Sequence, residues 1–246
     1  MKATAFEFRF RLWLSVAIIA LGFWAPWSEP LHMERHTTWL WLGFQLGGLG
    51  ISSTAGIELV TSLAIAAAAL AFVLRLWGTA YLGAATVFNA EMKAGHVLAD
   101  GPYRRMRNPL YLGSFLTIVA IAVLMPPSGA IVSLILLAVF LLRLILGEEA
   151  FLAPRLGESY AAYLKAVPRL FPSPWPRVAS GGRKPEWLRA LLGEIFPLGV
   201  LVSFAALSWQ YNSELLLRAI LISFGISLVT RALILPAHRP SGSEAL

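Results

Sequence analysis

The densest group of chemically capable side chains lies in one polar segment between two apolar runs. It reads His96-Val97-Leu98-Ala99-Asp100-Gly101-Pro102-Tyr103-Arg104-Arg105-Met106-Arg107-Asn108-Pro109-Leu110-Tyr111. Pro109 suits the first turn of a helix and Asn108 its N-cap, so a turn followed by a helix start is predicted. Free backbone N–H groups at such a start favour an anion such as a ligand carboxylate. An interfacial belt of tyrosine and arginine that contacts lipid headgroups is the structural alternative.

Two adjacent carboxylates, Glu148 and Glu149, form a second cluster at the end of an apolar run that contains Arg143. Adjacent carboxylates repel each other, so they need a cation or a ligand. Two structural explanations compete with ligand binding: the carboxylates are solvated at the membrane interface, or they pair with Arg104, Arg105 or Arg107. Arg143 is costly inside an apolar run and is a functional candidate, with pairing to Glu148 or snorkelling as its alternatives. Glu194 is a weaker candidate that we expect to snorkel to the interface.

The composition indicates a membrane protein. Of 246 residues, 58% are hydrophobic and 13% charged, and the mean hydropathy is +0.70. A soluble domain has about 45–50% apolar and about 25% charged residues. The absence of cysteine excludes disulfides, thiolate metal sites and a thiol nucleophile, and no metal site is expected. The net charge of +7 comes from basic residues that border apolar spans, which favours membrane topology over nucleic-acid binding.

The apolar runs predict an all-α, polytopic membrane protein with about six transmembrane helices. The spans are Leu12–Trp27, Ile57–Leu76, Leu110–Met125, Ser128–Leu146, Trp187–Trp209 and Glu214–Leu235. The apolar segment Trp39–Ile51 is too short for a comfortable span, so we expect an interfacial or re-entrant half-helix. If it crosses, the count becomes seven.

The distribution of basic residues predicts the orientation. The stretches 75–108 and 147–186 are rich in arginine and lysine, whereas the turns 126–129 and 210–213 contain neither. The basic stretches are therefore expected on the cytoplasmic side, with both termini. This predicts a multi-pass protein of a bacterial inner membrane or an equivalent cell membrane, with any active site at the cytoplasmic face.

Several short motifs occur in one order along the chain. They are Leu74-Arg75-Leu76-Trp77, Leu82-Gly83, His96-x-Leu98, Gly101-Pro102-Tyr103, Arg107-Asn108-Pro109-x-Tyr111, Glu148-Glu149-x-x-Leu152, Leu156-Gly157-x-x-Tyr160-x-x-Tyr163 and Val167-Pro168-Arg169. Together they resemble the isoprenylcysteine carboxyl methyltransferase family and the related membrane phospholipid methyltransferases. The resemblance covers roughly residues 70–172, a methyltransferase-like core. Outside it lie an N-terminal transmembrane region (1–69), a basic proline-rich linker (173–186) and a C-terminal transmembrane hairpin (187–246).

The resemblance implies that S-adenosylmethionine (SAM) is the cofactor. The cofactor contacts that it implies are Asn89, His96, Val97, Leu98, Ala99, Tyr103, Asn108, Pro109, Leu110, Tyr111 and Glu148. The catalytic candidates are Arg107, Tyr111 and Arg143, the last as a substrate-side arginine with one extra residue of spacing. Asn108 replaces the common histidine, which excludes a histidine-dependent proton step there.

These observations predict a SAM-dependent membrane methyltransferase that acts on a lipid-like or lipidated substrate. Methyl transfer from a sulfonium needs alignment and water exclusion more than acid–base groups, which fits the residues present. Two alternatives remain open: a sterol-type reductase that uses NADPH, and a transporter or membrane scaffold on a similar helical fold. Binding of S-adenosylhomocysteine rather than NADPH would separate them.

Overall fold

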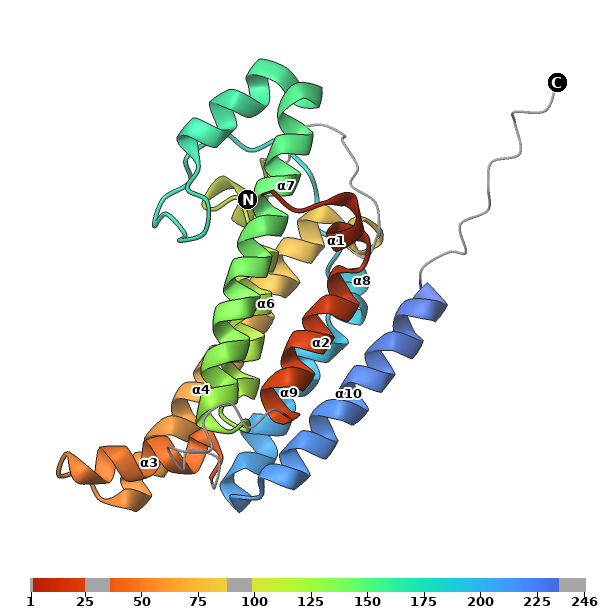
Figure 1. Cartoon of the computed structure of the whole chain (residues 1–246). Coiled ribbons are helices and arrows are strands. Elements are labelled where there is room, and N and C mark those ends of the chain that lie inside the picture. The colour runs from red at the N-terminus through yellow and green to blue at the C-terminus, as the bar shows by residue number, and fades with distance from the viewer. Residues whose placement is uncertain (1, 25–35, 88–98, 235–246) are drawn as a thin grey trace.

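The computed structural model describes residues 2–24, 36–87 and 99–234, and every regular element in those ranges is helical (Figure 1). The all-α prediction is therefore confirmed for the part of the chain described. The elements are α1 (Ala5–Arg9), α2 (Arg11–Trp24), α3 (Thr38–Gly48), α4 (Ser53–Leu82), α5 (Ala84–Val87), η3 (Gly101–Arg104), α6 (Pro109–Ala122), α7 (Pro127–Ala166), α8 (Trp187–Gly193), α9 (Ile195–Leu207), η4 (Ser208–Gln210) and α10 (Ser213–Ile234).

Three of the described helices, α4, α7 and α10, are long and apolar enough to cross a membrane, and the bent pair α8–α9 would make a fourth span. They indicate an integral membrane protein. The helices α2 and α6 each have 14 residues. At about 1.5 Å per residue each is about 21 Å long, less than the ~30 Å hydrocarbon core. The structure thus supports three to four spans by this measure, and the prediction of six is not shown.

Two predicted boundaries are wrong. The run that begins at Pro127 forms a helix of 40 residues, with a non-helical residue at Gly157 (φ 59°). The helix includes Glu148 and Glu149 and ends at Ala166, well beyond the predicted end at Leu146. The predicted continuous span Trp187–Trp209 is instead broken at Glu194, where α8 and α9 meet at 70°. Pro197 explains the break. It has no N–H to donate to the carbonyl of residue 193, and in a continuous helix its ring would clash with that carbonyl.

Small residues let the central helices approach closely. Ala64, Ala68 and Ala71 are buried on α4, which packs against α6 and α9. A Cβ atom on Gly129 of α7 would lie 1.9 Å from the carbonyl oxygen of Gly22 on α2, so only glycine fits at this crossing. Close backbone approach of this kind is how membrane helices associate without a hydrophobic driving force.

The short helix α3 lies across one end of the bundle (Figure 1). It has 11 residues and is tied to the turn after α6, because the backbone N–H of Trp39 donates to the carbonyl of Val123 at 2.8 Å. The buried Trp39 indole also donates to Thr61 of α4 at 2.9 Å. A helix of this length cannot cross the membrane. This agrees with the prediction for Trp39–Ile51.

The two ends of α3 are expected to face the same side of the membrane. His36 and Ser53 flank the helix, and both are exposed. Single cysteines placed there in this cysteine-free chain, His36→Cys and Ser53→Cys, should both react with an impermeant maleimide in intact cells, or both fail to react. Labelling of one position alone would show that α3 crosses.

Candidate active site

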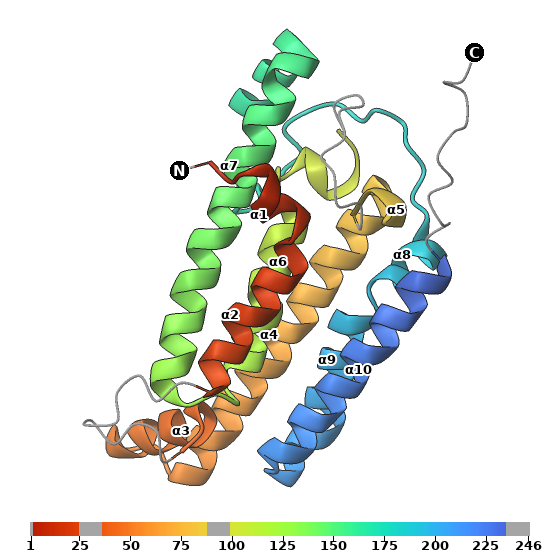
Figure 2. The same cartoon turned by 45° about the vertical axis from the view of Figure 1, so that its right-hand side comes forward.

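A cavity of about 920 Å³ lies within the helical bundle, and it has a polar end and an apolar half. Its polar end is lined by Tyr103, Arg107, Asn108, Pro109, Tyr111, Glu148, Glu149, Tyr160 and Tyr163 among others. Its apolar half is lined by side chains of α2, α6, α7, α9 and α10, and Figure 2 shows α2 between α7 and α10. Ligand pockets commonly combine a largely apolar wall with a few convergent polar groups. The cavity is therefore the candidate active site.

Glu148 and Tyr111 meet at the polar end. The Tyr111 hydroxyl, on α6, donates to Glu148 Oε2, on α7, at 3.0 Å. Both residues were predicted to contact the cofactor, and the structure brings them together across two helices. The second oxygen of the carboxylate has no hydrogen bond among the described residues. Glu148 can therefore accept a bond from a ligand donor.

Tyr103 is held in a buried turn beside this pair. Gly101 begins the turn with a φ of 54°, a conformation that favours glycine. The carbonyl of Tyr103 accepts a bond from the Tyr163 hydroxyl at 2.9 Å, which fixes the turn against α7. The Tyr103 side chain is 8% exposed, and its own hydroxyl has no partner among the described residues. Burial, and then the nearby Glu148, raise the pKa of this hydroxyl well above its ordinary value, so it stays protonated as a donor.

Asp100 fixes the start of the same turn. Its carboxylate accepts bonds from the Ser180 hydroxyl at 2.5 Å and from the backbone N–H groups of Gly182 and Arg183 at 3.1 and 3.2 Å. Although burial alone would raise the pKa of Asp100, these hydrogen bonds outweigh it and lower the pKa. The contact therefore anchors the basic linker over the turn that carries Tyr103.

Glu149 points to two arginines. Its Oε1 lies 3.0 Å from Arg107 Nη1 and its Oε2 lies 2.9 Å from Arg169 Nη2. The pairing alternative for the glutamate pair therefore holds for Glu149, whereas Glu148 bonds to Tyr111. The Arg107 side chain is 12% exposed, and its buried Nε has no hydrogen-bond partner among the described residues. Arg107 consequently keeps one donor for a ligand in the cavity.

Three further predicted residues lie at the start of α6. Pro109 is the first residue of the helix, as predicted, and Asn108 occupies the N-cap position. Its amide does not cap the helix as predicted, but donates from Nδ2 to the carbonyl of Arg169 at 3.0 Å. The reason is that the segment after α7 returns over this end of α6. Asn108, Pro109 and Leu110 all line the cavity.

The structure does not place the remaining cofactor candidates at the cavity. Asn89, His96, Val97 and Leu98 lie outside the described residues. The carbonyl of Ala99 accepts a bond from the N–H of Gly181 at 3.3 Å, and Ala99 does not line the cavity. Among the described residues, no group of three or more acidic or imidazole side chains could hold a metal ion.

Arg143 is turned away from the cavity. Its Nε and Nη2 each lie 2.9 Å from a carboxylate oxygen of Glu7, on the N-terminal helix α1. The Arg143 hydrogen bond lowers the pKa of Glu7 to about 2. Arg143 has no hydrogen bond to its predicted partner Glu148, which bonds to Tyr111 instead. Arg143 is also not among the residues that line the cavity. The structure therefore does not bring Arg143 together with the other predicted site residues at the cavity, and its role as a substrate-side arginine stays a prediction.

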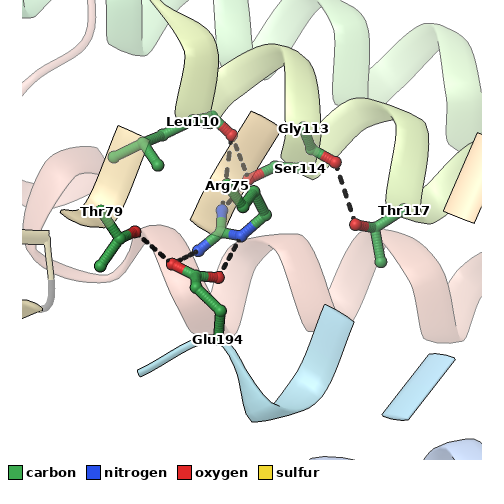
Figure 3. Close-up of polar contacts among 7 residues, drawn as sticks. All are labelled: Arg75, Thr79, Leu110, Gly113, Ser114, Thr117 and Glu194. Carbon is green, nitrogen blue, oxygen red and sulfur yellow. Dashed lines mark hydrogen bonds and ion pairs between the residues drawn. The ribbon is translucent and has the colours of Figure 1, made fainter. Parts of the chain in front are cut away.

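An ion pair that was not predicted lies beside the cavity (Figure 3). Glu194, expected to snorkel, is fully buried, and its two oxygens lie 2.6 and 3.0 Å from Arg75 Nε and Nη2. Thr79 donates to the same carboxylate at 2.5 Å, and Arg75 Nη1 donates to Ser114 at 2.6 Å. Opposite charges inside apolar runs must find each other, a signal that could have predicted this pair.

One family model matches the part of the chain that contributes the polar end of this cavity. Residues 59–159 match the family model described as phospholipid methyltransferase. The match spans most of α4, all of η3 and α6, and α7 as far as Ser159, and so includes Tyr103, Arg107, Tyr111 and Glu148. No curated protein and no solved structure matches the chain.

Loss of one partner of the Arg75–Glu194 pair should strongly destabilise the fold. Glu194→Ala leaves Arg75 as an uncompensated buried charge, which costs about 3–5 kcal/mol. Replacing both residues (Arg75→Met with Glu194→Leu) should recover much of this loss. Equilibrium unfolding in detergent measures both, and Glu186→Ala is the control.

The control breaks the exposed Arg189–Glu186 pair, whose side chains are 73% and 46% exposed. Its expected cost is about 0–1 kcal/mol. Equal costs for Glu194→Ala and Glu186→Ala would contradict the structural role assigned to Glu194.

Proposed function

We propose that this chain, whose residues 59–159 match the phospholipid methyltransferase family model, is a SAM-dependent enzyme that transfers the SAM methyl group to a lipid acceptor. One observation carries the proposal: a single cavity joins the polar motif residues of the matched region to an apolar half lined by α2, α6, α7, α9 and α10. A water-soluble cofactor and a hydrocarbon chain can therefore approach each other inside it.

The polar end fits the functional groups of SAM. Glu148 can accept from an ammonium or from ribose hydroxyls, and Arg107 can hold a carboxylate through its unpartnered Nε. The Tyr103 hydroxyl, also without a partner among the described residues, supplies a second donor. Two of these groups are buried donors whose desolvation a ligand would compensate. When bound, SAM supplies an electrophilic methyl group.

The residues of this chain act by placement rather than by proton transfer. Tyr103, Tyr111 and Tyr160 line the same end and present aromatic faces, which favour a cation such as a sulfonium. The apolar half excludes water from the space that an acceptor would share with the methyl group. Tyr111 and Arg107 are positioned by Glu148 and Glu149 respectively. This supports in-line transfer governed by alignment.

The topology that we propose puts the polar end at the cytoplasmic face. The same end of the bundle carries the basic linker between α7 and α8, in the upper part of Figure 1. Such charges are retained on the cytoplasmic side. With α2 and α6 as additional, locally short spans, the six predicted spans would be reached. Asn89, His96, Val97, Leu98 and Ala99 remain proposed cofactor contacts on the resemblance alone.

Removal of the Tyr103 hydroxyl, which has no hydrogen-bond partner among the described residues, tests whether this group contacts a ligand or stabilises the fold. Tyr103→Phe removes a buried hydroxyl without a described partner, so the free energy of unfolding should hardly change. S-adenosylhomocysteine binding should nevertheless weaken several-fold, as measured by calorimetry in detergent. Tyr163→Phe, which removes the bond to the Tyr103 carbonyl, should instead lower stability by about 1 kcal/mol. Unchanged ligand affinity in Tyr103→Phe would remove Tyr103 from the site.

The carboxylate of Glu148 is expected to bind the cofactor directly. Glu148→Gln should weaken S-adenosylhomocysteine binding by about 1.5–3 kcal/mol, the scale of a charge-assisted hydrogen bond. Glu158→Gln, at an exposed position ten residues further along α7, is the matched control and should bind normally. If wild-type protein shows no thermal shift with millimolar S-adenosylhomocysteine, the proposed function fails.

A further inference from the structure

The chain from residue 2 to residue 11, which we call the N-terminal corner, forms part of the wall at the polar end of the cavity. The helix α1 turns away from α2 at Phe10 and lies across α7 (Figure 2). Phe8, Arg9 and Arg11 line the cavity. Arg11 is near enough to Glu148 for their opposite charges to attract each other. The corner therefore lies beside the carboxylate that we expect to bind the cofactor.

Arg143 fixes one side of the corner to α7. Its Nε and Nη2 each lie 2.9 Å from a different carboxylate oxygen of Glu7, and its carbonyl accepts from the N–H of Ala3 at 3.0 Å. Glu7 is itself held by a capping box, because its carboxylate accepts from the N–H of Thr4 at 2.7 Å. Two parallel bonds between a guanidinium and a carboxylate fix orientation as well as distance. Arg143 thus determines where α1 lies.

Arg11 fixes the other side of the corner to α5. Its Nη2 donates to the carbonyl of Val87 at 2.8 Å, and its guanidinium lies 4.4 Å from the centroid of the Phe8 ring. Val87 also lines the cavity, and Phe8 is 8% exposed. The corner therefore extends over the polar end from α7 to α5, with the Phe8 ring as its buried part.

Polar contacts hold most of the corner in place. Within α1 only Phe8 is buried, whereas Ala5, Phe6 and Arg9 are exposed. A segment with few buried apolar contacts opens at a lower free-energy cost than the core of a protein. Phe10 lies between the two helices and can act as the hinge, because changes of backbone angle there reorient α1 against α2. Breaking the contact between Glu7 and Arg143 would therefore let the corner open.

We propose that the N-terminal corner is a lid over the polar end of the cavity, and that Arg143 is the positioning residue that keeps it closed through Glu7. The inference rests on the proposed function for its ligand, SAM, which is soluble in water and enters from the aqueous side. An open lid admits the cofactor, and a closed one excludes water during methyl transfer. Arg143 then takes part in the reaction without touching the substrate.

A reversible cross-link between α1 and α7 tests the lid. A Cβ atom on Gly147 would lie 3.3 Å from the Cβ of Ala3, close to the ~3.5–4.5 Å that a disulfide spans. Ala3→Cys with Gly147→Cys introduces the only two cysteines of the chain. Oxidation should slow both association and dissociation of S-adenosylhomocysteine by at least about tenfold, and a reductant should restore both rates.

A second cross-link at the opposite end of the bundle is the matched control. Gly47 lies near the end of α3 and Ser53 begins α4, far from α1 (Figure 1). A Cβ atom on Gly47 would lie 3.9 Å from that of Ser53. Gly47→Cys with Ser53→Cys should leave both rates unchanged, oxidised or reduced. Equal exchange rates in the oxidised and reduced cross-link between α1 and α7 would refute the lid.

Removal of the ion pair should have the opposite effect. Glu7→Gln and Arg143→Gln should each raise both rate constants by about threefold to tenfold, while the Kd changes less than either rate. The exchange Glu7→Arg with Arg143→Glu restores a pair and should return the rates toward those of the wild type. Glu214→Gln breaks an exposed pair on α10 and should change neither rate. Lower stability with unchanged rates in Glu7→Gln and Arg143→Gln would show a structural role alone and overturn the proposal.

Access to the cavity can also be measured without a cofactor. Leu144 lines the cavity and is 1% exposed. The variant Leu144→Cys should react with a water-soluble maleimide several-fold faster when Glu7→Gln is added, whereas the exposed Ser53→Cys should react equally in both backgrounds. Equal reaction of Leu144→Cys would contradict the lid. If folded wild-type protein binds no S-adenosylhomocysteine, the proposed function fails, and this measurement then decides the role of Arg143.

Discussion

The need to neutralise charge inside an apolar bundle is the constraint on which the rest of this structure depends. Arg75 and Glu194 satisfy it together, at 2.6 Å, with Thr79 and Ser114 completing their hydrogen bonds. The pair joins α4 and α6, which belong to the matched region, to the break between α8 and α9, which does not. An unpaired charge there would cost several kcal/mol, so the C-terminal hairpin docks in one position. That position forms one wall of the cavity.

The need to pair buried charges also shapes the cavity, which has a polar end and an apolar wall. At the polar end, Glu149 neutralises Arg107, and Glu148 accepts from Tyr111, so the side chains are held without a ligand. The groups left over, the Tyr103 hydroxyl and Arg107 Nε, are those that a ligand can engage. Beyond them the wall is apolar and comes from helices that approach the core at glycine crossings such as Gly22 with Gly129. One cavity therefore joins a polar end to an apolar wall.

Patterns local in the sequence predicted much of this arrangement. The motif from Tyr103 to Tyr111 and the glutamate pair converge on one cavity, and Pro109 begins its helix as expected. Contacts between distant segments were not predictable in the same way. Glu7 takes Arg143 away from the cavity, because α1 folds back on α7, a long-range approach that no spacing reveals.

Helix ends were also predicted poorly, for a physical reason. Hydropathy marks the residue at which the side chains stop being apolar. The helix α7 continues past that residue, because its backbone hydrogen bonds form in water as well as in lipid. Conversely, Trp187–Trp209 is largely apolar yet bends at Glu194, where Pro197 removes a helical bond and the carboxylate turns to Arg75. In both cases backbone chemistry decided the boundary.

Transfer of a labelled methyl group tests the central claim most directly. Purified protein in bilayer nanodiscs of mixed phospholipids would be incubated with SAM that carries tritium in its methyl group, and the lipids extracted into organic solvent. Methyl transfer to a lipid acceptor predicts label in the organic phase that increases with time and is lost in Glu148→Gln. Folded wild-type protein that binds S-adenosylhomocysteine yet leaves every lipid fraction unlabelled, across the phospholipids of its native membrane, would contradict it.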